Sequence, residues 1–126
     1  MSCPLALRLS EFDERVIQPA AQRHFGRRVT LVRQIGAYSC RMRTGGGRLS
    51  EHASGRAIDI AGFEIAGGPR IAVKGDWRDP GPRGAFLREV ALAACQWFSV
   101  VLTPNHDTWH ADHLHLDLGR HRLCGL

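Results

Sequence analysis

The stretch "DHLHLDL", residues 112–118, places His113, His115 and Asp117 at alternate positions. Successive side chains of a β-strand point to opposite faces, so these three groups would share one face and three leucines the other. Imidazole and carboxylate groups bind divalent metal ions and exchange protons. Because buried polar groups need partners, we expect this face to form a site for a metal or for proton transfer. The alternative is an ordinary solvated strand face.

A second stretch, "SEHASGRAIDI", contains His52 and Asp59. From Ala57 onward it alternates like a strand, with Asp59 between small alanines on the face opposite two isoleucines, which leaves space for a metal or a ligand. On a continuous helix His52 and Asp59 would lie about 10 Å apart. That is too far for both to reach one zinc ion through bonds of about 2 Å. We therefore expect a loop at Gly55 to fold His52 back towards Asp59.

Together the two stretches supply histidine, aspartate and histidine from separate elements. A catalytic zinc ion commonly has three protein ligands and leaves its fourth position to water. Zinc lowers the pKa of that water to about 7 and polarises a substrate carbonyl. Asp112 and His113 would add a general base and a group that stabilises an oxyanion. The pattern favours a hydrolase, although imidazole and carboxylate ligands also accept other divalent metals.

The elements that must position these groups follow from apolar periodicity. A helix is expected from a capping box at Ser10 to a stop at Gly26, kinked or divided at Pro19. Strands are expected within residues 28–41, 55–65, 67–77, 99–104 and 113–119, and a second helix within residues 79–98. The order predicts an α+β fold with a mainly antiparallel sheet packed against two or three helices.

Composition bounds the class of protein. The chain has 126 residues, 44% hydrophobic and 23% charged, which predicts a single globular domain over residues 1–126, expected to be a monomer. No apolar run approaches the roughly 20 residues of a membrane span, and the start "MSCPLALRLS" does not read as a signal peptide. The net charge of +5 indicates a solvated basic surface or attraction to a polyanion such as an acidic wall polymer. Scattered arginines with few interleaved aromatics argue against nucleic-acid binding.

The four cysteines, Cys3, Cys40, Cys95 and Cys124, form no C-x-x-C pair, which argues against a zinc ribbon or a thioredoxin-type motif. An even, dispersed set favours two disulfides in an oxidising compartment, with three pairings open. Cys3 and Cys124 lie near the two ends of the chain, where a bridge would hold down segments that otherwise fray. The alternative is four buried thiols in a cytosolic protein.

The motifs carry a family resemblance. The pattern S-x-H-x-x-G-x-A-x-D is matched at every fixed position, from Ser50 to Asp59, and H-x-H follows at residues 113–115. This resembles the zinc peptidases of bacterial cell walls, a group that unites lysostaphin-type enzymes, D-Ala-D-Ala metallopeptidases and the hedgehog signalling domain. The chain is more closely similar to the bacterial extensin-like C-terminal domain, through "AYSCR", "SEHASGRAIDI", "GDW", "FLREV", "AC" and "DHLHLDL".

The resemblance implies a hedgehog- or D-Ala-D-Ala-peptidase-like fold with a zinc cleft on the sheet. Carried over position by position, it implies that His52, Asp59 and His115 bind one zinc ion together with water. Relatives use either an acidic residue or the first histidine of H-x-H as the base, so Asp112 and His113 are assigned jointly as catalytic.

Further roles are less specific. Arg41 falls where relatives have an arginine that contacts the substrate or its oxyanion. Ser50 either orients the loop or the ligands or simply forms a turn or a cap, and Asp117 is either the partner of a histidine or a surface carboxylate. Weaker candidates for lining the cleft are Trp77, Trp109 and His110.

The resulting hypothesis is a zinc-dependent peptidase that hydrolyses peptidoglycan stem peptides or cross-links in the periplasm or cell envelope. The sequence leaves open which bond is cut, and whether the enzyme is an endopeptidase or a carboxypeptidase. The alternative is a non-catalytic, metal-containing module that binds cell-wall polymer. Asp112 and His113 favour the enzyme, because a module needs neither.

Overall fold

The computed structural model describes residues 3–35, 56–106 and 111–126. Its elements in chain order are α1 (Cys3–Phe12), the π-helical segment η1 (Asp13–Ile17), α2 (Gln18–Phe25), β1 (Val29–Ile35), β2 (Ala57–Ile65), β3 (Arg70–Ala72), α3 (Val73–Asp76), α4 (Pro82–Ala94), β4 (Val100–Leu102), β5 (Leu114–Asp117) and β6 (Leu123–Gly125). Every strand expected from the sequence has a counterpart among them, whereas α3 and β6 were not expected.

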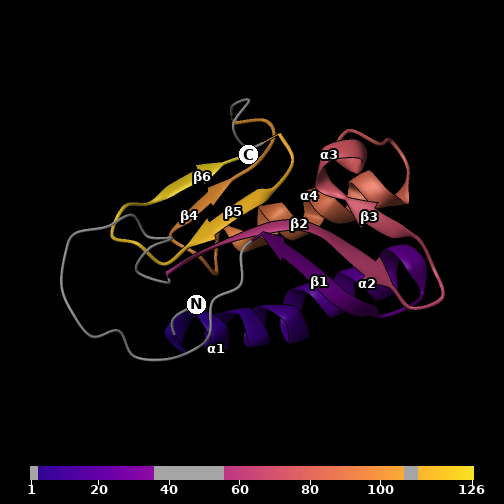
Figure 1. Cartoon of the computed structure of the whole chain (residues 1–126), viewed down its shortest axis with the longest axis horizontal. Coiled ribbons are helices and arrows are strands. Elements are labelled where there is room, and N and C mark those ends of the chain that lie inside the picture. The colour runs from indigo at the N-terminus through magenta and orange to yellow at the C-terminus, as the bar shows by residue number, and fades with distance from the viewer. Residues whose placement is uncertain (1–2, 36–55, 107–110) are drawn as a thin grey trace.

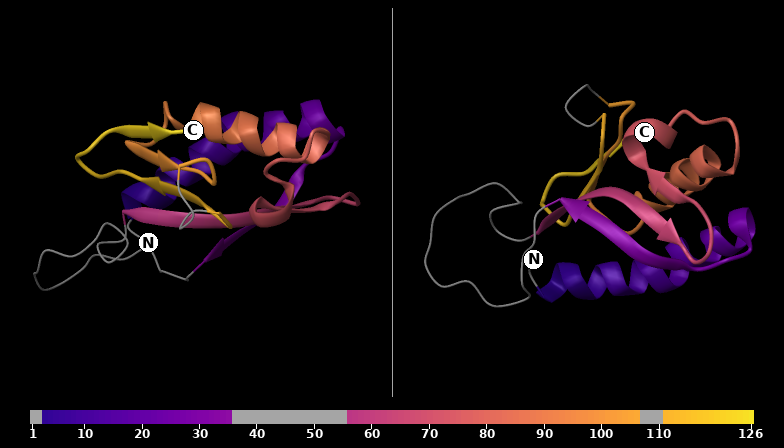
Figure 2. Two further views of the ribbon diagram at one scale, coloured as in Figure 1. Left: turned by 90° about the horizontal axis from the view of Figure 1, so that it is seen from above. Right: turned by 45° about the vertical axis from the view of Figure 1, so that its right-hand side comes forward.

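The strands form one mixed sheet that is mostly antiparallel. Their order is β1-β2-β5-β4-β6, with β3 also pairing with β2, and β4 and β6 are the parallel pair. Figures 1 and 2 show α1, α2 and α4 together on one face of this sheet. The predicted α+β fold with a mainly antiparallel sheet and a few helices is confirmed.

The long central strand β2 organises the sheet. Residues 57–60 pair with β5, and residues 62–64 pair with β3. On its other edge β2 pairs with β1, and the register there shifts between Arg33 and Gln34, which oppose Gly62 and Ile60. Ala61 is therefore the extra residue of a β-bulge, located where β2 changes partner from β5 to β3.

The N-terminal helix begins at Cys3, so the predicted start at Ser10 was wrong. The earlier turns are helical because Leu5 and Phe12, seven residues apart, bury the same helical face in the core. The predicted division at Pro19 corresponds to η1, which ends two residues before the proline. The predicted stop at Gly26 is confirmed: it adopts φ 66°, and its N–H donates to the Gln22 carbonyl.

The core lies between the helices and the sheet, and its centre is aromatic. Phe86 of α4 contacts Phe63 of β2 edge to face, with ring centroids 5.1 Å apart, and Phe12 contacts Phe98 in the same way at 5.3 Å. Trp77 is only 4% exposed, and its indole N–H donates to Asn105. It therefore packs in the core, and the expectation that it lines the cleft is wrong.

One disulfide joins Cys95, just after α4, to Cys124 in β6, with the two Cα atoms 5.5 Å apart. Cys3 is also disulfide-bonded, and the described residues include no free cysteine. The expectation of disulfides is confirmed, while a bridge between the two ends of the chain, Cys3 to Cys124, is not formed. Within the described ranges, no helix has the length and apolar character needed to cross a bilayer.

Candidate metal centre

Antiparallel pairing of β2 and β5 brings the two motif strands together. Asp59 lies directly opposite His115 in the register. On the other face of the same strands Ile58, Ile60 and Leu114 are buried against the helices. The alternation predicted from the sequence is thus present in both strands, and it places the aspartate and the histidine on the face opposite the helices.

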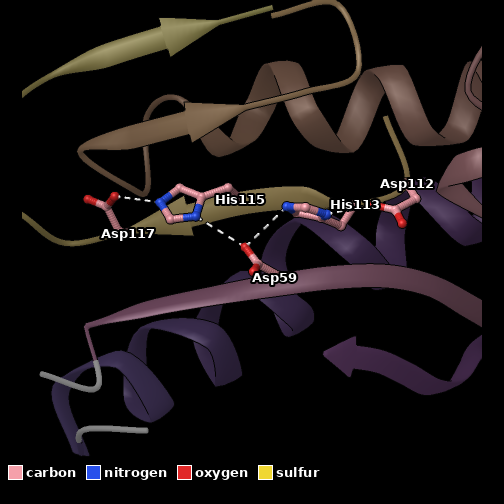
Figure 3. Close-up of polar contacts among 5 residues, drawn as sticks. All are labelled: Asp59, Asp112, His113, His115 and Asp117. Atoms are coloured by element: carbon pink, nitrogen blue, oxygen red, sulfur yellow. Dashed lines mark hydrogen bonds and ion pairs between the residues drawn. The ribbon is translucent and has the colours of Figure 1, made fainter. Parts of the chain in front are cut away.

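His115 is held between two carboxylates (Figure 3). Its Nδ1 lies 3.1 Å from Asp59 Oδ1, and its Nε2 lies 2.7 Å from Asp117 Oδ2. The other oxygen of Asp117 accepts a hydrogen bond of 2.9 Å from the backbone N–H of Gly119. The side chains of His115 and Asp117 are only 13% and 8% exposed. Asp117 is therefore the partner of a histidine and not a surface carboxylate.

The two carboxylates change the acidity of the ring. Burial by itself lowers the pKa of His115, but hydrogen bonds and charge attraction from Asp117 and Asp59 outweigh it and raise the pKa to about 9. In the metal-free protein both ring nitrogens therefore carry protons at neutral pH and donate to the two carboxylates. A metal ion that binds Nδ1 has to displace the proton there.

His113 directly precedes β5 and approaches the same carboxylate. Its Nδ1 lies 2.8 Å from Asp112 Oδ1, so the N–H donates to that carboxylate, and its Nε2 lies 3.7 Å from Asp59 Oδ1. The side chain of His113 is 15% exposed, whereas that of Asp112 is 58% exposed. The hydrogen bond from His113 lowers the pKa of Asp112, which stays ionised.

The spacing of Asp59 and His115 is compatible with two ligands of one zinc ion. Two ligands of a tetrahedral zinc, each bound at about 2.0–2.1 Å, lie about 3.3 Å apart. The observed separation of Asp59 Oδ1 and His115 Nδ1 is 3.1 Å. Asp117 supports His115 as outer carboxylates support metal-bound histidines, by accepting a hydrogen bond from the other ring nitrogen. The described ranges alone hold no set of three ligands for a metal.

Several predicted site residues lie outside the described residues. These are Arg41, Ser50, His52, Trp109 and His110. The structure therefore brings together Asp59, Asp112, His113 and His115 of the predicted set, and adds Asp117 as a bonded partner. The signal for Asp117 was present in the sequence, because it continues the alternation of the two histidines.

Residues 1–125 match the family model described as extensin-like protein C-terminus. The chain belongs to this family. No curated protein and no solved structure matches the chain. In this extensin-like C-terminal domain, the relation to zinc peptidases that the motifs imply stays a prediction.

Proposed function

We propose that this extensin-like domain is a zinc-dependent peptidase that hydrolyses peptide bonds of peptidoglycan in the periplasm or cell envelope. One observation carries the proposal. An aspartate oxygen and a histidine nitrogen from two paired strands lie 3.1 Å apart, while a second carboxylate holds the far nitrogen of the same histidine. Asp59 and His115 would be two of the three protein ligands of a catalytic zinc ion, and Asp117 would supply the outer hydrogen bond that zinc-bound histidines usually make.

His52, Asp59 and His115 are the proposed metal ligands, with water in the fourth position. A zinc ion bound there would lower the pKa of its water to about 7 and polarise the carbonyl of the bond to be cut. Asp117 fixes the orientation of His115, because its carboxylate accepts the Nε2 proton and leaves Nδ1 to face Asp59.

We propose different roles for Asp112 and His113. Asp112 accepts the Nδ1–H of His113 at 2.8 Å, so Nε2 is the ring nitrogen that faces Asp59. We assign Nε2 of His113 as the general base that takes a proton from the attacking water and passes it to the leaving amine. Asp112 positions the ring, and the hydrogen bond from His113 lowers the pKa of Asp112.

Other features support the wall as the place of action. The net charge of +5 favours association with anionic polymers, and the Cys95–Cys124 disulfide is compatible with an oxidising compartment. The motif resemblance supplies the substrate class and assigns Arg41 to substrate binding. The alternative from the sequence is a metal-containing module that binds the wall. The two hypotheses predict different effects of replacing His113, the histidine that is not a proposed metal ligand.

The test combines metal analysis with product analysis on purified sacculi. We expect about one zinc per chain and release of peptide fragments from the wild-type protein. His115→Ala should lose both zinc and hydrolysis, because it removes a ligand. His113→Ala should keep zinc and lose about 100-fold or more in rate, as removal of a general base does. The module would be established instead if the wild type and His113→Ala both bind one zinc per chain and bind the wall, and neither releases peptides.

A further inference from the structure

Strand β1 places a cation on the same face as the candidate metal centre. Its register pairs Ile35 with Asp59 and Arg33 with Gly62. Val32 and Gln34 lie towards the helices, where they line a cavity with Ile58 and Ile60. Arg33 and Ile35 alternate with them and therefore lie on the face of Asp59. No motif drew attention to Arg33, because its position follows only from the register and the bulge.

The guanidinium of Arg33 extends across β2 above Gly62. A Cβ atom at Gly62 would lie 2.2 Å from the backbone oxygen of Ile71 and 2.4 Å from Nη2 of Arg33, so the backbone of β3 requires glycine here and the guanidinium packs against it. Nη2 donates a long hydrogen bond of 3.4 Å to the Ile71 carbonyl of β3. Arg33 thus crosses the strand at the bulge, between the part of β2 that pairs with β5 and the part that pairs with β3.

The guanidinium of Arg33 makes few hydrogen bonds within the described part of the protein. The bond to Ile71 is its one hydrogen bond there, and it forms no ion pair with a carboxylate of those residues. Its Nε is buried and has no hydrogen-bond partner within the same ranges. An arginine has five N–H donors, and buried donors without partners are costly and uncommon in native structures. Nε is covered by protein, but Nη1 is not buried and has no hydrogen-bond partner among the described residues, so it can bind a ligand beside the candidate active site.

We propose that Arg33 binds a carboxylate of the peptide substrate close to the bond that is cut. The planar guanidinium offers parallel N–H groups that match a carboxylate in geometry and charge. Arg33 lies two residues from Ile35, the partner of Asp59, which is about 7 Å along an extended strand. The guanidinium itself lies beside Gly62, three residues from Asp59 in β2, which is about 10 Å along an extended strand and places the anchored carboxylate about three residues from the cleaved amide. Ile35, 48% exposed, offers an apolar contact between the two points.

This inference specifies the substrate of the proposed peptidase, yet its test is a binding measurement that needs no turnover. The probe is a stem tetrapeptide with free carboxylates, compared with the same peptide in which the carboxylates are converted to carboxamides. The wild-type protein should bind the acid about ten-fold or more tightly than the amide, as expected for a charge-assisted hydrogen bond. The Nε–H resonance of Arg33 should shift on addition of the acid and stay in place with the amide.

Two variants and a matched control assign the preference to one side chain. Arg33→Gln should reduce the acid-to-amide ratio to about two-fold or less, and Arg33→Lys should retain part of it, because lysine keeps the charge without the planar fork. Arg28→Gln removes the same charge from the exposed residue just before β1 and should leave the ratio unchanged. Zinc content should equal that of the wild type in all three variants.

The outcomes separate this inference from the proposed function. If the wild-type protein shows no preference for the acid, or if Arg33→Gln keeps the full preference, the inference is wrong even when the protein cleaves sacculi. If the preference depends on Arg33 and no peptide is ever released, Arg33 is a carboxylate-binding residue of a module that is not a peptidase. The shift of the Arg33 resonance is read on the wild-type protein, so it decides the matter even where a variant does not fold.

Discussion

At the scale of single residues, Asp117 is the side chain whose removal should weaken metal binding without removing a ligand. Its carboxylate lies 2.7 Å from Nε2 of His115. In Asp117→Asn the side-chain oxygen can still accept that proton, but the charge that makes the imidazole a stronger ligand is lost. We expect zinc affinity to fall about 10- to 100-fold, which competition with a chelator measures.

Asp112→Asn is the matched control for that variant. It also removes a carboxylate that binds a histidine ring nitrogen, at a comparable distance of 2.8 Å, but the histidine is His113. We expect unchanged zinc affinity and a lower rate of hydrolysis. Equal losses of zinc in the two variants would show that both histidines are ligands, contrary to the roles assigned above.

The sequence predicted part of this site at residue level. Alternation in two separate stretches was enough to place Asp59 and His115 on one face, because side-chain direction in a strand has a period of two. The sequence could not assign different roles to Asp112 and His113, because the assignment depends on which ring nitrogen of His113 donates its proton to Asp112. Arg33 could not be found at all, because its place beside Asp59 follows from the pairing of β1 with β2.

At the scale of elements, the close packing of β2 against β3 next to the bulge requires a glycine at position 62. A Cβ atom at Gly62 would lie 2.2 Å from the Ile71 carbonyl oxygen in the backbone of β3 and 2.4 Å from Arg33. Gly62→Ala should therefore force β2 and β3 apart and lower the free energy of unfolding by about 1–3 kcal/mol, as overpacking does. Urea denaturation followed by circular dichroism measures the change.

Gly75→Ala in α3 is the corresponding control, because a Cβ there meets no atom within 4 Å. A helical glycine replaced by alanine without strain should leave stability unchanged or raise it by up to about 1 kcal/mol. Equal destabilisation by the two substitutions would contradict the close approach of β3 and Arg33 to β2.

Element types were more predictable than element ends. Pro19 and Gly26 marked the middle and the end of the first helical region because each acts through its own backbone. The start at Cys3 depends on burial of Leu5 against other elements, so a local capping signal at Ser10 was misleading. Strand β6 carries no alternation, since it is three residues long and is held by β4 and a disulfide.

At the scale of the whole molecule, the disulfide and the candidate metal centre lie in different parts of the sheet. Cys124 is in β6, the last strand of the order, whereas Asp59 and His115 come from β2 and β5. Strand β4 stands between them and pairs with both β5 and β6. The disulfide is therefore expected to stabilise the fold without contacting the proposed metal ligands Asp59 and His115.

Removal of this disulfide should lower the stability of the fold and leave metal binding unchanged. The bridge closes a loop with a sequence separation of 29 residues. By the chain-entropy model, its loss should lower the free energy of unfolding by about 3–4 kcal/mol. In the double variant Cys95→Ala and Cys124→Ala, assayed at 10 °C to keep the chain folded, zinc content and affinity should equal those of the wild type. Loss of zinc from the folded double variant would show that β6 supports the ligand strands through β4, and that the fold and the site are not independent.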